Sequence, residues 1–160
     1  MQMVKTALAA VLSWLLATLL IPGEPPVFAT VAALIVIQPS VNQSYTKAFE
    51  RSVGVILGVL IALGAVLAFG ERSWLVLVAT VIAVVAGWLL RLTATSSTQI
   101  AISAMLVLSI GAATPEYAAA RVLETLLGAG VALVINALIA PPVLAAPARL
   151  AVARLAREEA

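Results

Sequence analysis

Long apolar runs separated by short polar segments form the main pattern of this chain. A helix needs about 20 apolar residues to cross the hydrocarbon layer of a bilayer, and six runs reach or approach that length. The predicted helices are Thr6–Ile21, Pro26–Gln38, Thr46–Phe69, Ser73–Leu90, Gln99–Ala113 and Pro115–Ala140. The pattern therefore predicts an all-α, polytopic membrane protein with six transmembrane helices.

The composition also indicates that lipid, and not water, surrounds most of the chain. The chain of 160 residues is 64% hydrophobic and 10% charged, whereas a soluble domain has about a quarter of charged residues. It contains no Asp, His or Cys. We therefore expect no catalytic residues, no metal site, no cofactor and no enzymatic activity. A net charge of +2 gives no basic footprint for nucleic acid.

Lysine and arginine in the short loops predict the orientation in the membrane. With a cytoplasmic N-terminus, the cytoplasmic side holds Lys5, Lys47, Arg51, Arg91, Arg149, Arg154 and Arg157, and the outer side holds Arg72 and Arg121. We expect a protein of the plasma (inner) membrane with both termini in the cytoplasm. Residues 1–143 form the membrane domain. Residues 144–160 are either an amphipathic interfacial tail or the first helix of a soluble cytoplasmic domain that is missing from this chain.

An offset of seventy residues superposes residues 6–69 on residues 73–140. Arg51 then falls on Arg121, Gly58 on Gly128, and Ser44 on Thr114, the last two being predicted helix caps. Because each copy has three helices, the second copy must be inverted in the membrane. Inverted repeats are typical of transporters, whose sites lie at the repeat interface.

Short or interrupted helices at matching positions in two repeats indicate the binding site. The second and fifth helices are such a pair, and Lys47 and Arg51 could attract an anion beside them. The predicted substrate-binding residues are Gln38, Pro39, Ser40, Lys47, Arg51, Gln99, Ser103 and Ser109.

Charges near the starts of the third and sixth helices have two interpretations. Ionisable groups in spanning helices are functional candidates, but long side chains within two turns of a helix end can also reach water. Arg121 and Glu124, three residues apart, can form an ion pair. Glu124 and Glu50 are the candidates for proton coupling.

Small residues in the same two helices indicate close packing of helices. The predicted packing residues are Gly54, Gly58, Gly128, Gly130 and Asn136, the last through an interhelical hydrogen bond.

Two segments carry a resemblance to a known family. VAALIVIQPSVNQSYTKAFERSVGVILGVLIA and RVLETLLGAGVALVINALIAPP resemble the second, third and sixth helices of the fusaric acid resistance protein-like (FUSC) membrane domain. The shared features are the QPS end of a helix, an Arg-x-x-Gly helix, and an Arg followed by Glu, Gly, Asn and a Pro pair. Val55 stands where the family usually has Thr. By position, the family's marked residues are Gln38, Pro39, Ser40, Arg51, Gly54, Gly58, Arg121, Glu124, Gly128 and Asn136.

The resemblance implies transport, because the family includes aromatic acid exporters and resembles the plant malate channels. Our leading hypothesis is an inner-membrane exporter of organic anions such as aromatic carboxylic acids. The alternatives are an anion channel and a non-transporting membrane anchor or assembly module for a cytoplasmic domain. The expected partners are lipid, a small organic anion and a second copy of the chain in a homodimer.

Overall fold

The computed structural model describes residues 2–21, 25–70, 72–109 and 114–139. Within these ranges all regular structure is helical, which confirms the all-α prediction. The helices are α1 (Gln2–Leu20), α2 (Val27–Val36), α3 (Val41–Phe69), α4 (Leu75–Leu89), α5 (Ala94–Ser109) and α6 (Pro115–Leu138). The predicted tail of residues 144–160 lies outside the described residues.

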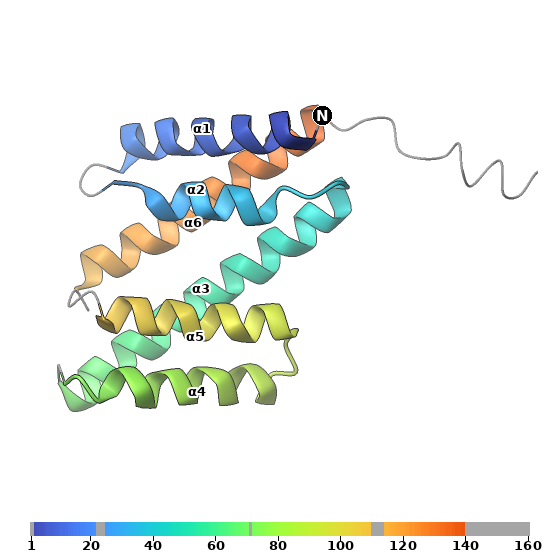
Figure 1. The fold of residues 1–160 in the computed structure, drawn as a ribbon. Helices are drawn as coiled ribbons and strands as arrows, with labels where there is room; N and C mark the ends of the chain where they lie inside the picture. The colour runs from blue at the N-terminus through green and yellow to red at the C-terminus, as the bar shows by residue number, and fades with distance from the viewer. Residues whose placement is uncertain (1, 22–24, 71, 110–113, 140–160) are drawn as a thin grey trace, which may run out of the picture.

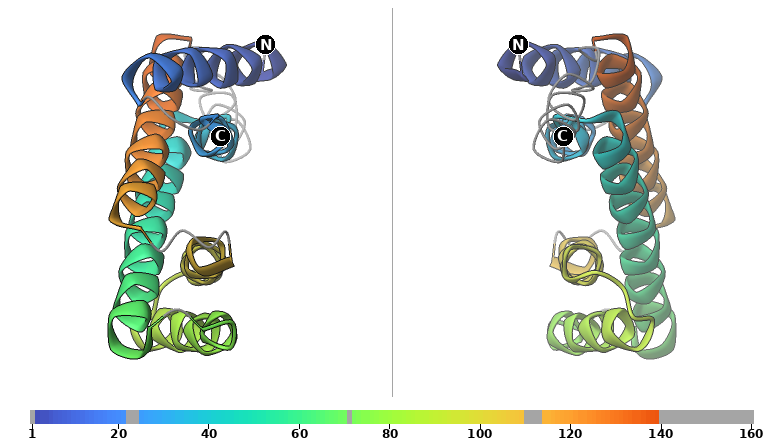
Figure 2. Two further views of the ribbon diagram at one scale, coloured as in Figure 1. Left: turned by 90° about the vertical axis from the view of Figure 1, so that its left-hand side faces the viewer. Right: turned by 90° about the vertical axis from the view of Figure 1, so that its right-hand side faces the viewer.

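The helices form two layers (Figure 1). Helices α1, α2, α5 and α4 lie side by side in that order, and the long helices α3 and α6 run obliquely behind them (Figures 1 and 2). Helix α2 packs on α1 and α6, α5 packs on α4 and α3, and α3 packs on α6. Contact between α2 and α5 is marginal at most, so the α1–α2 pair and the α4–α5 pair are connected through α3 and α6.

Three described helices are long and apolar enough to cross a membrane, namely α1, α3 and α6. Helices α2, α4 and α5 have 10, 15 and 16 residues, so even the longest of them measures only about 24 Å against a hydrocarbon layer of about 30 Å. The structure therefore contains three full-length candidate spans where the sequence predicts six. Helix α3, with 29 residues, is longer than the hydrocarbon layer is thick. It runs obliquely to the short helices, and such a tilt would fit its length to the layer.

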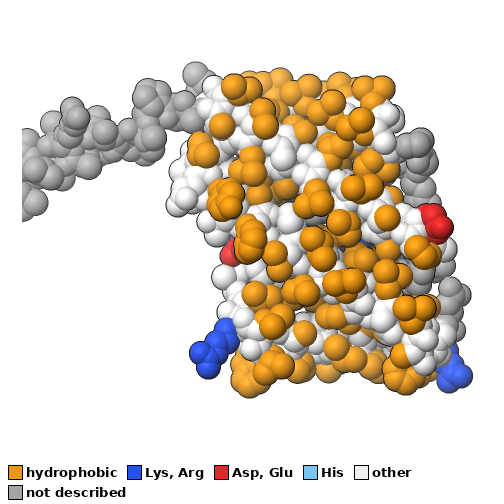
Figure 3. Space-filling view, turned by 180° about the vertical axis from the view of Figure 1, so that it is seen from behind, with side chains coloured by type: hydrophobic (Ala, Val, Ile, Leu, Met, Phe, Trp, Pro, Cys, Tyr) orange, Lys and Arg blue, Asp and Glu red, His pale blue; other side chains and the backbone are white. Residues whose placement is uncertain are grey.

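The outer face of α3 and α6 is apolar. In the view from behind, hydrophobic side chains are spread over the whole face and charged groups lie at its edges (Figure 3). Leu60 of α3 and Leu123 of α6 are 59% and 55% exposed. Soluble monomeric proteins rarely expose an apolar surface of this extent to water, whereas a surface in contact with lipid is apolar. Together with the long apolar helices, it identifies an integral membrane protein.

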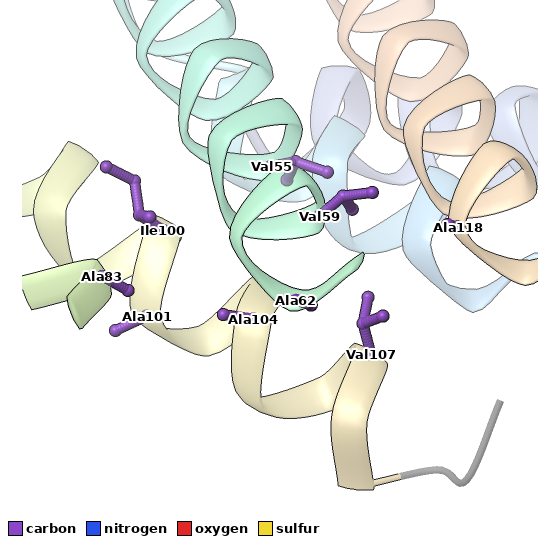
Figure 4. Packing of buried hydrophobic residues seen from close by; sticks show 9 residues of the cluster. All are labelled: Val55, Val59, Ala62, Ala83, Ile100, Ala101, Ala104, Val107 and Ala118. Carbon is purple, nitrogen blue, oxygen red and sulfur yellow. The ribbon is translucent and has the colours of Figure 1, made fainter. Parts of the chain in front are cut away.

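Small side chains fill the interior. Figure 4 shows one cluster, in which Val55, Val59 and Ala62 of α3 meet residues of α5, with Ala83 of α4 and Ala118 of α6 at its sides. A second cluster joins α1, α2 and α6 around Ala33, Val36 and Ala132. Such small residues let helix backbones approach closely where lipid removes the hydrophobic driving force.

Buried positions recur with the seventy-residue offset. Helix α1 buries Lys5, Ala9, Ser13 and Ala17, and α4 buries Leu75, Ala79, Ala83 and Gly87. Helix α3 buries Ala48, Arg51, Gly54, Val55, Gly58, Val59 and Ala62, and α6 buries Ala118, Arg121, Glu124, Thr125, Gly128, Ala129 and Ala132. Each of these positions is seventy residues from its counterpart, so the two sequence repeats use largely equivalent faces for packing. Ser44 of α3 and Ile135 and Asn136 of α6 are also buried, and their counterparts are not.

Three of the four glycines chosen from the sequence lie at close helix contacts. A Cβ on Gly54 would meet the Gln99 side chain, one on Gly58 would meet the backbone of α5 at Ile100, and one on Gly128 would meet the backbone of α2 at Ala29. Gly130 is exposed and borders open space. The packing prediction is therefore wrong for Gly130 within this chain.

Several predicted helix ends are displaced. Helix α3 begins at Val41 because Ser40, and not Ser44, is its cap: the Ser40 hydroxyl accepts a hydrogen bond from the Gln43 N–H at 3.2 Å. Helix α5 begins at Ala94, so the polar segment before Gln99 is helical. The Thr114 cap of α6 is confirmed by its 3.3 Å hydrogen bond from the Tyr117 N–H.

Candidate functional site

Two buried arginines lie in the long helices α3 and α6. Arg51 of α3 is 5% exposed and Arg121 of α6 is 2% exposed, so neither guanidinium reaches water, the alternative that the sequence left open. For Arg51 the reason is the early start of α3. Arg51 lies ten residues, or about 15 Å, beyond Val41, and therefore not in the first two turns of the helix as the sequence predicted. The charge of Arg121 acts on Arg51, so the two like charges lie within electrostatic reach.

Arg51 has an acceptor on only part of its guanidinium. Its Nη1 donates to Gln99 Oε1 at 2.9 Å, and Gln99 Nε2 donates to Ser103 Oγ at 3.3 Å. The buried Nε of Arg51 has no hydrogen-bond partner among the described residues. The structure thus brings together Arg51, Gln99 and Ser103, three of the predicted binding residues, at the contact of α3 with α5.

Arg121 rests on an aromatic ring. Its guanidinium carbon lies 3.9 Å from the centroid of the Phe28 ring in α2, a cation–π contact. Tyr117 and Glu124 also interact with it electrostatically. Its buried Nε and Nη1 have no hydrogen-bond partner in the described part of the chain, so this guanidinium retains donors that no acceptor occupies.

Glu124 holds the start of α2. Its Oε2 accepts a hydrogen bond from the Phe28 N–H at 3.0 Å, one of the helix N-terminal donors that α2 cannot satisfy internally. The residue at the cap position, Pro26, supplies no side-chain hydrogen bond. Glu124 therefore caps α2 from another helix, while its proposed part in proton coupling stays a prediction.

A second polar group anchors the start of α5 on α3. Lys47 Nζ and Glu50 Oε2 form a salt bridge of 2.8 Å, and Thr93 Oγ1 donates to Glu50 Oε1 at 2.9 Å. Lys47 is partly exposed, and such pairs contribute about 1 kcal/mol or less. The acidic groups of both long helices thus lie at the starts of the short helices of the opposite half.

Four other predicted binding residues make no polar contact with Arg51 or Arg121 among the described residues, namely Gln38, Pro39, Ser40 and Ser109. Gln38, Pro39 and Ser40 form the turn between α2 and α3, where the Gln38 N–H donates to Ser44 Oγ at 2.8 Å. Ser109 is exposed at the end of α5. The binding roles of these residues stay predictions. In the structure, Gln38 and Ser40 make hydrogen bonds that stabilise the turn between α2 and α3.

An open apolar groove of about 410 Å³ lies between α3 and the first half of α6. Its lining residues are Val59, Leu63, Pro115, Ala118, Ala119, Val122 and Leu123. None of them belongs to the predicted binding site, so the groove gives no support to a polar cavity at the level of Gln38–Ser40.

A third polar contact joins α1 to α6. The sequence predicted an interhelical hydrogen bond of Asn136, but not the part of Lys5 in it. Lys5 is 2% exposed and donates to Asn136 Oδ1 at 3.3 Å. Asn136 Nδ2 donates to Ser44 Oγ at 2.7 Å, which is an interhelical hydrogen bond. The spacing of small residues after Lys5 in α1 could have indicated its burial, since Ala9 and Ser13 follow at four-residue intervals on the same helix face.

Comparison with known proteins gives a match to one family model. The model described as fusaric acid resistance protein-like matches residues 6–135. This range includes the contacts of Arg51, Arg121, Glu124 and Glu50, whereas Lys5 and Asn136 lie just outside it. No curated protein and no solved structure gives a significant match.

Proposed function

Because this chain belongs to the fusaric acid resistance protein-like family, we propose that it exports organic anions, among them aromatic carboxylates, across the plasma (inner) membrane. The observation that carries the proposal is the pair of buried arginines with unoccupied N–H groups. Burying an ion costs several kcal/mol unless a partner compensates it, and ionisable groups inside a membrane protein mark substrate pathways by default. A carboxylate is the natural partner, since it accepts two parallel hydrogen bonds from one guanidinium.

The arrangement of the halves supports an inverted repeat. Equivalent faces of α3 and α6 are buried, and each arginine contacts a short helix of the other sequence repeat, Arg51 at Gln99 of α5 and Arg121 at Phe28 of α2. Three helices in each half would place the second copy upside down, with the binding site at the repeat interface. Both termini then lie in the cytoplasm, as the distribution of lysine and arginine predicts.

Gln99 gives the site a way to release its anion. Its amide oxygen now occupies Arg51 Nη1, so an arriving carboxylate competes with a neutral acceptor and not with a fixed negative charge. A charged acceptor binds a guanidinium about twice as strongly as a neutral one. The carboxylate can therefore displace Gln99, and Gln99 can return when the anion leaves. Glu124 and Glu50 are the candidates for coupling this exchange to a proton.

Transport in proteoliposomes tests the proposal, with radiolabelled 4-hydroxybenzoate as the probe. We expect Arg51→Gln to lower the initial uptake rate about tenfold or more, because a charged hydrogen bond contributes about 1.5–3 kcal/mol. Arg72→Gln is the control, since Arg72 is an exposed arginine in the connection between α3 and α4. Equal uptake by Arg51→Gln and wild type would refute the role of Arg51.

The same preparation separates the alternatives. A steady current under voltage without dependence on a pH gradient would identify a channel. Absence of uptake across a panel of labelled organic acids, with and without a pH gradient, would favour the anchor or assembly module, for which the apolar groove beside α6 is a suitable packing surface.

A further inference from the structure

Lys5 occupies a position that the other half of the molecule fills with an apolar residue. It belongs to the buried face of α1, where it is 2% exposed, and its counterpart in α4 is Leu75, which is 1% exposed. The remaining residues of both faces are small. Packing at this position therefore does not require a charge, and a buried lysine needs another reason.

The hydrogen bonds around Lys5 fix the direction in which it meets Asn136. Ser44 Oγ accepts from the Gln38 N–H at 2.8 Å and from Asn136 Nδ2 at 2.7 Å. These bonds turn the Asn136 amide so that its Oδ1 faces Lys5 Nζ at 3.3 Å. Asn136 and Ser44 are both completely buried. The ammonium is held in place by a neutral oxygen at the long end of hydrogen-bonding distance.

No acidic group neutralises Lys5 within the described part of the chain. Its only hydrogen bond there goes to Asn136, although an ammonium has three donors. A buried charge without a counter-ion is costly in a membrane protein and marks an ion or substrate pathway. Lys5 shares this condition with Arg51, whereas Arg121 has Glu124 as an electrostatic partner.

Lys5 of α1 is connected to the start of α3 through Asn136 and Ser44, and Arg51 lies further along α3. Ser44, in the Lys5 network, precedes Arg51 by seven residues, or about 10 Å along α3. Arg51 in turn lies within electrostatic reach of Arg121. Transport through a membrane requires sites that hold the ion weakly enough to pass it on, and successive single cations such as Lys5 and Arg51 would provide them.

From this geometry we infer that Lys5 is a further binding station for the carboxylate of the transported anion, at the end of the molecule where α3 begins. The inference rests on the proposed function. The anion leaves water for Lys5 Nζ, displaces Asn136 Oδ1 and then passes to Arg51. At the opposite end the counterparts of Lys5 and Asn136 are Leu75 and Val66, so this station exists at one end only.

Uptake of labelled 4-hydroxybenzoate by full-length protein in proteoliposomes tests the station. Lys5→Gln removes the charge but keeps a donor for Asn136, so a purely structural lysine would tolerate it. We expect KM to rise about tenfold while the thermal unfolding midpoint in detergent changes little. Lys5→Arg, which retains the charge, should keep KM within about threefold of wild type.

The outcomes are separable. If wild-type protein takes up no organic anion, the proposed function fails; if wild type transports and Lys5→Gln has the same KM, only the station fails. Lys5→Leu, which copies Leu75, carries the test if Lys5→Gln does not fold. Failure of both neutral variants to fold would make Lys5 structural and overturn the inference.

Lipid composition distinguishes a lipid phosphate from a transported carboxylate. We expect the difference between wild type and Lys5→Gln to be equal in vesicles of phosphatidylcholine and in vesicles that also contain phosphatidylglycerol. A difference confined to the anionic vesicles would assign Lys5 to a lipid headgroup and overturn the inference.

Discussion

Among single residues, Glu124 combines two tasks that a sequence motif cannot separate. Its carboxylate accepts the Phe28 N–H at the start of α2, and its charge acts on Arg121. The first task needs only an oxygen, whereas the second needs a negative charge. A helix N-terminus also favours a negative charge nearby because of the helix dipole.

We predict that Glu124→Gln is milder than Glu124→Leu. Glutamine keeps an acceptor for the Phe28 N–H, while leucine leaves that donor without one, at a cost of about 1–3 kcal/mol. Unfolding midpoints in detergent should therefore fall in the order wild type, Glu124→Gln, Glu124→Leu. Glu116→Gln, at an exposed acid in the first turn of α6, is the control with a smaller effect. Equal midpoints for the two Glu124 variants would show that the capping bond contributes little.

At the scale of helices, contact between backbones decides which glycines matter. Gly128 faces the α2 backbone at Ala29, whereas Gly130, two residues later, faces open space. The two share a helix and a sequence neighbourhood but lie on different sides of α6. Residues two apart on a helix do not share a face, so the sequence alone could group them wrongly.

We predict opposite effects for alanine at these two positions. Gly128→Ala forces α6 away from α2 and should cost about 1–3 kcal/mol or more, as overpacking does. Gly130→Ala meets no neighbour and should be neutral or stabilise the helix by up to about 1 kcal/mol. Thermal unfolding of both variants in the same detergent checks the pair. A stable Gly128→Ala would contradict the close packing of α2 on α6.

For the whole molecule, the arrangement in the membrane is the next question. An inverted repeat requires that α4, with only 15 residues, cross the bilayer. The chain has no cysteine, so single-cysteine variants can be labelled without background.

We predict that Asn42→Cys and Ala94→Cys react with a membrane-impermeant maleimide from the cytoplasmic side, and that Ser73→Cys reacts from the outside. All three positions are exposed at helix ends or connections. Ser73 precedes α4 and Ala94 follows it, so labelling of both from one side would show that α4 does not cross.

Sequence reasoning captured the helices and part of the site, for reasons that are local. Apolar runs identify helices wherever they stand, and Arg51 with the i, i+4 pair Gln99 and Ser103 could be chosen by residue type. The true start of α3 was missed because Ser40 and Ser44 offer the same capping chemistry, and only packing at the Asn136 contact decides that Ser44 is interior. The bonds of Glu124 to Phe28 and of Lys5 to Asn136 join residues 96 and 131 positions apart. No local pattern encodes such pairs.

The short helix α4 also has a consequence for the lipid around it. Trp74 and Trp88, exposed at its two ends, are fourteen residues apart, or about 21 Å along the helix. Tryptophan rings settle at the headgroup level of a bilayer. If α4 crosses the bilayer, as an inverted repeat requires, a hydrocarbon layer of about 30 Å would have to thin by several Å beside it, at a cost that grows with the hydrophobic mismatch. With α4 in that position, this side of the protein would be better suited to lipids with short acyl chains than the side formed by α3 and α6.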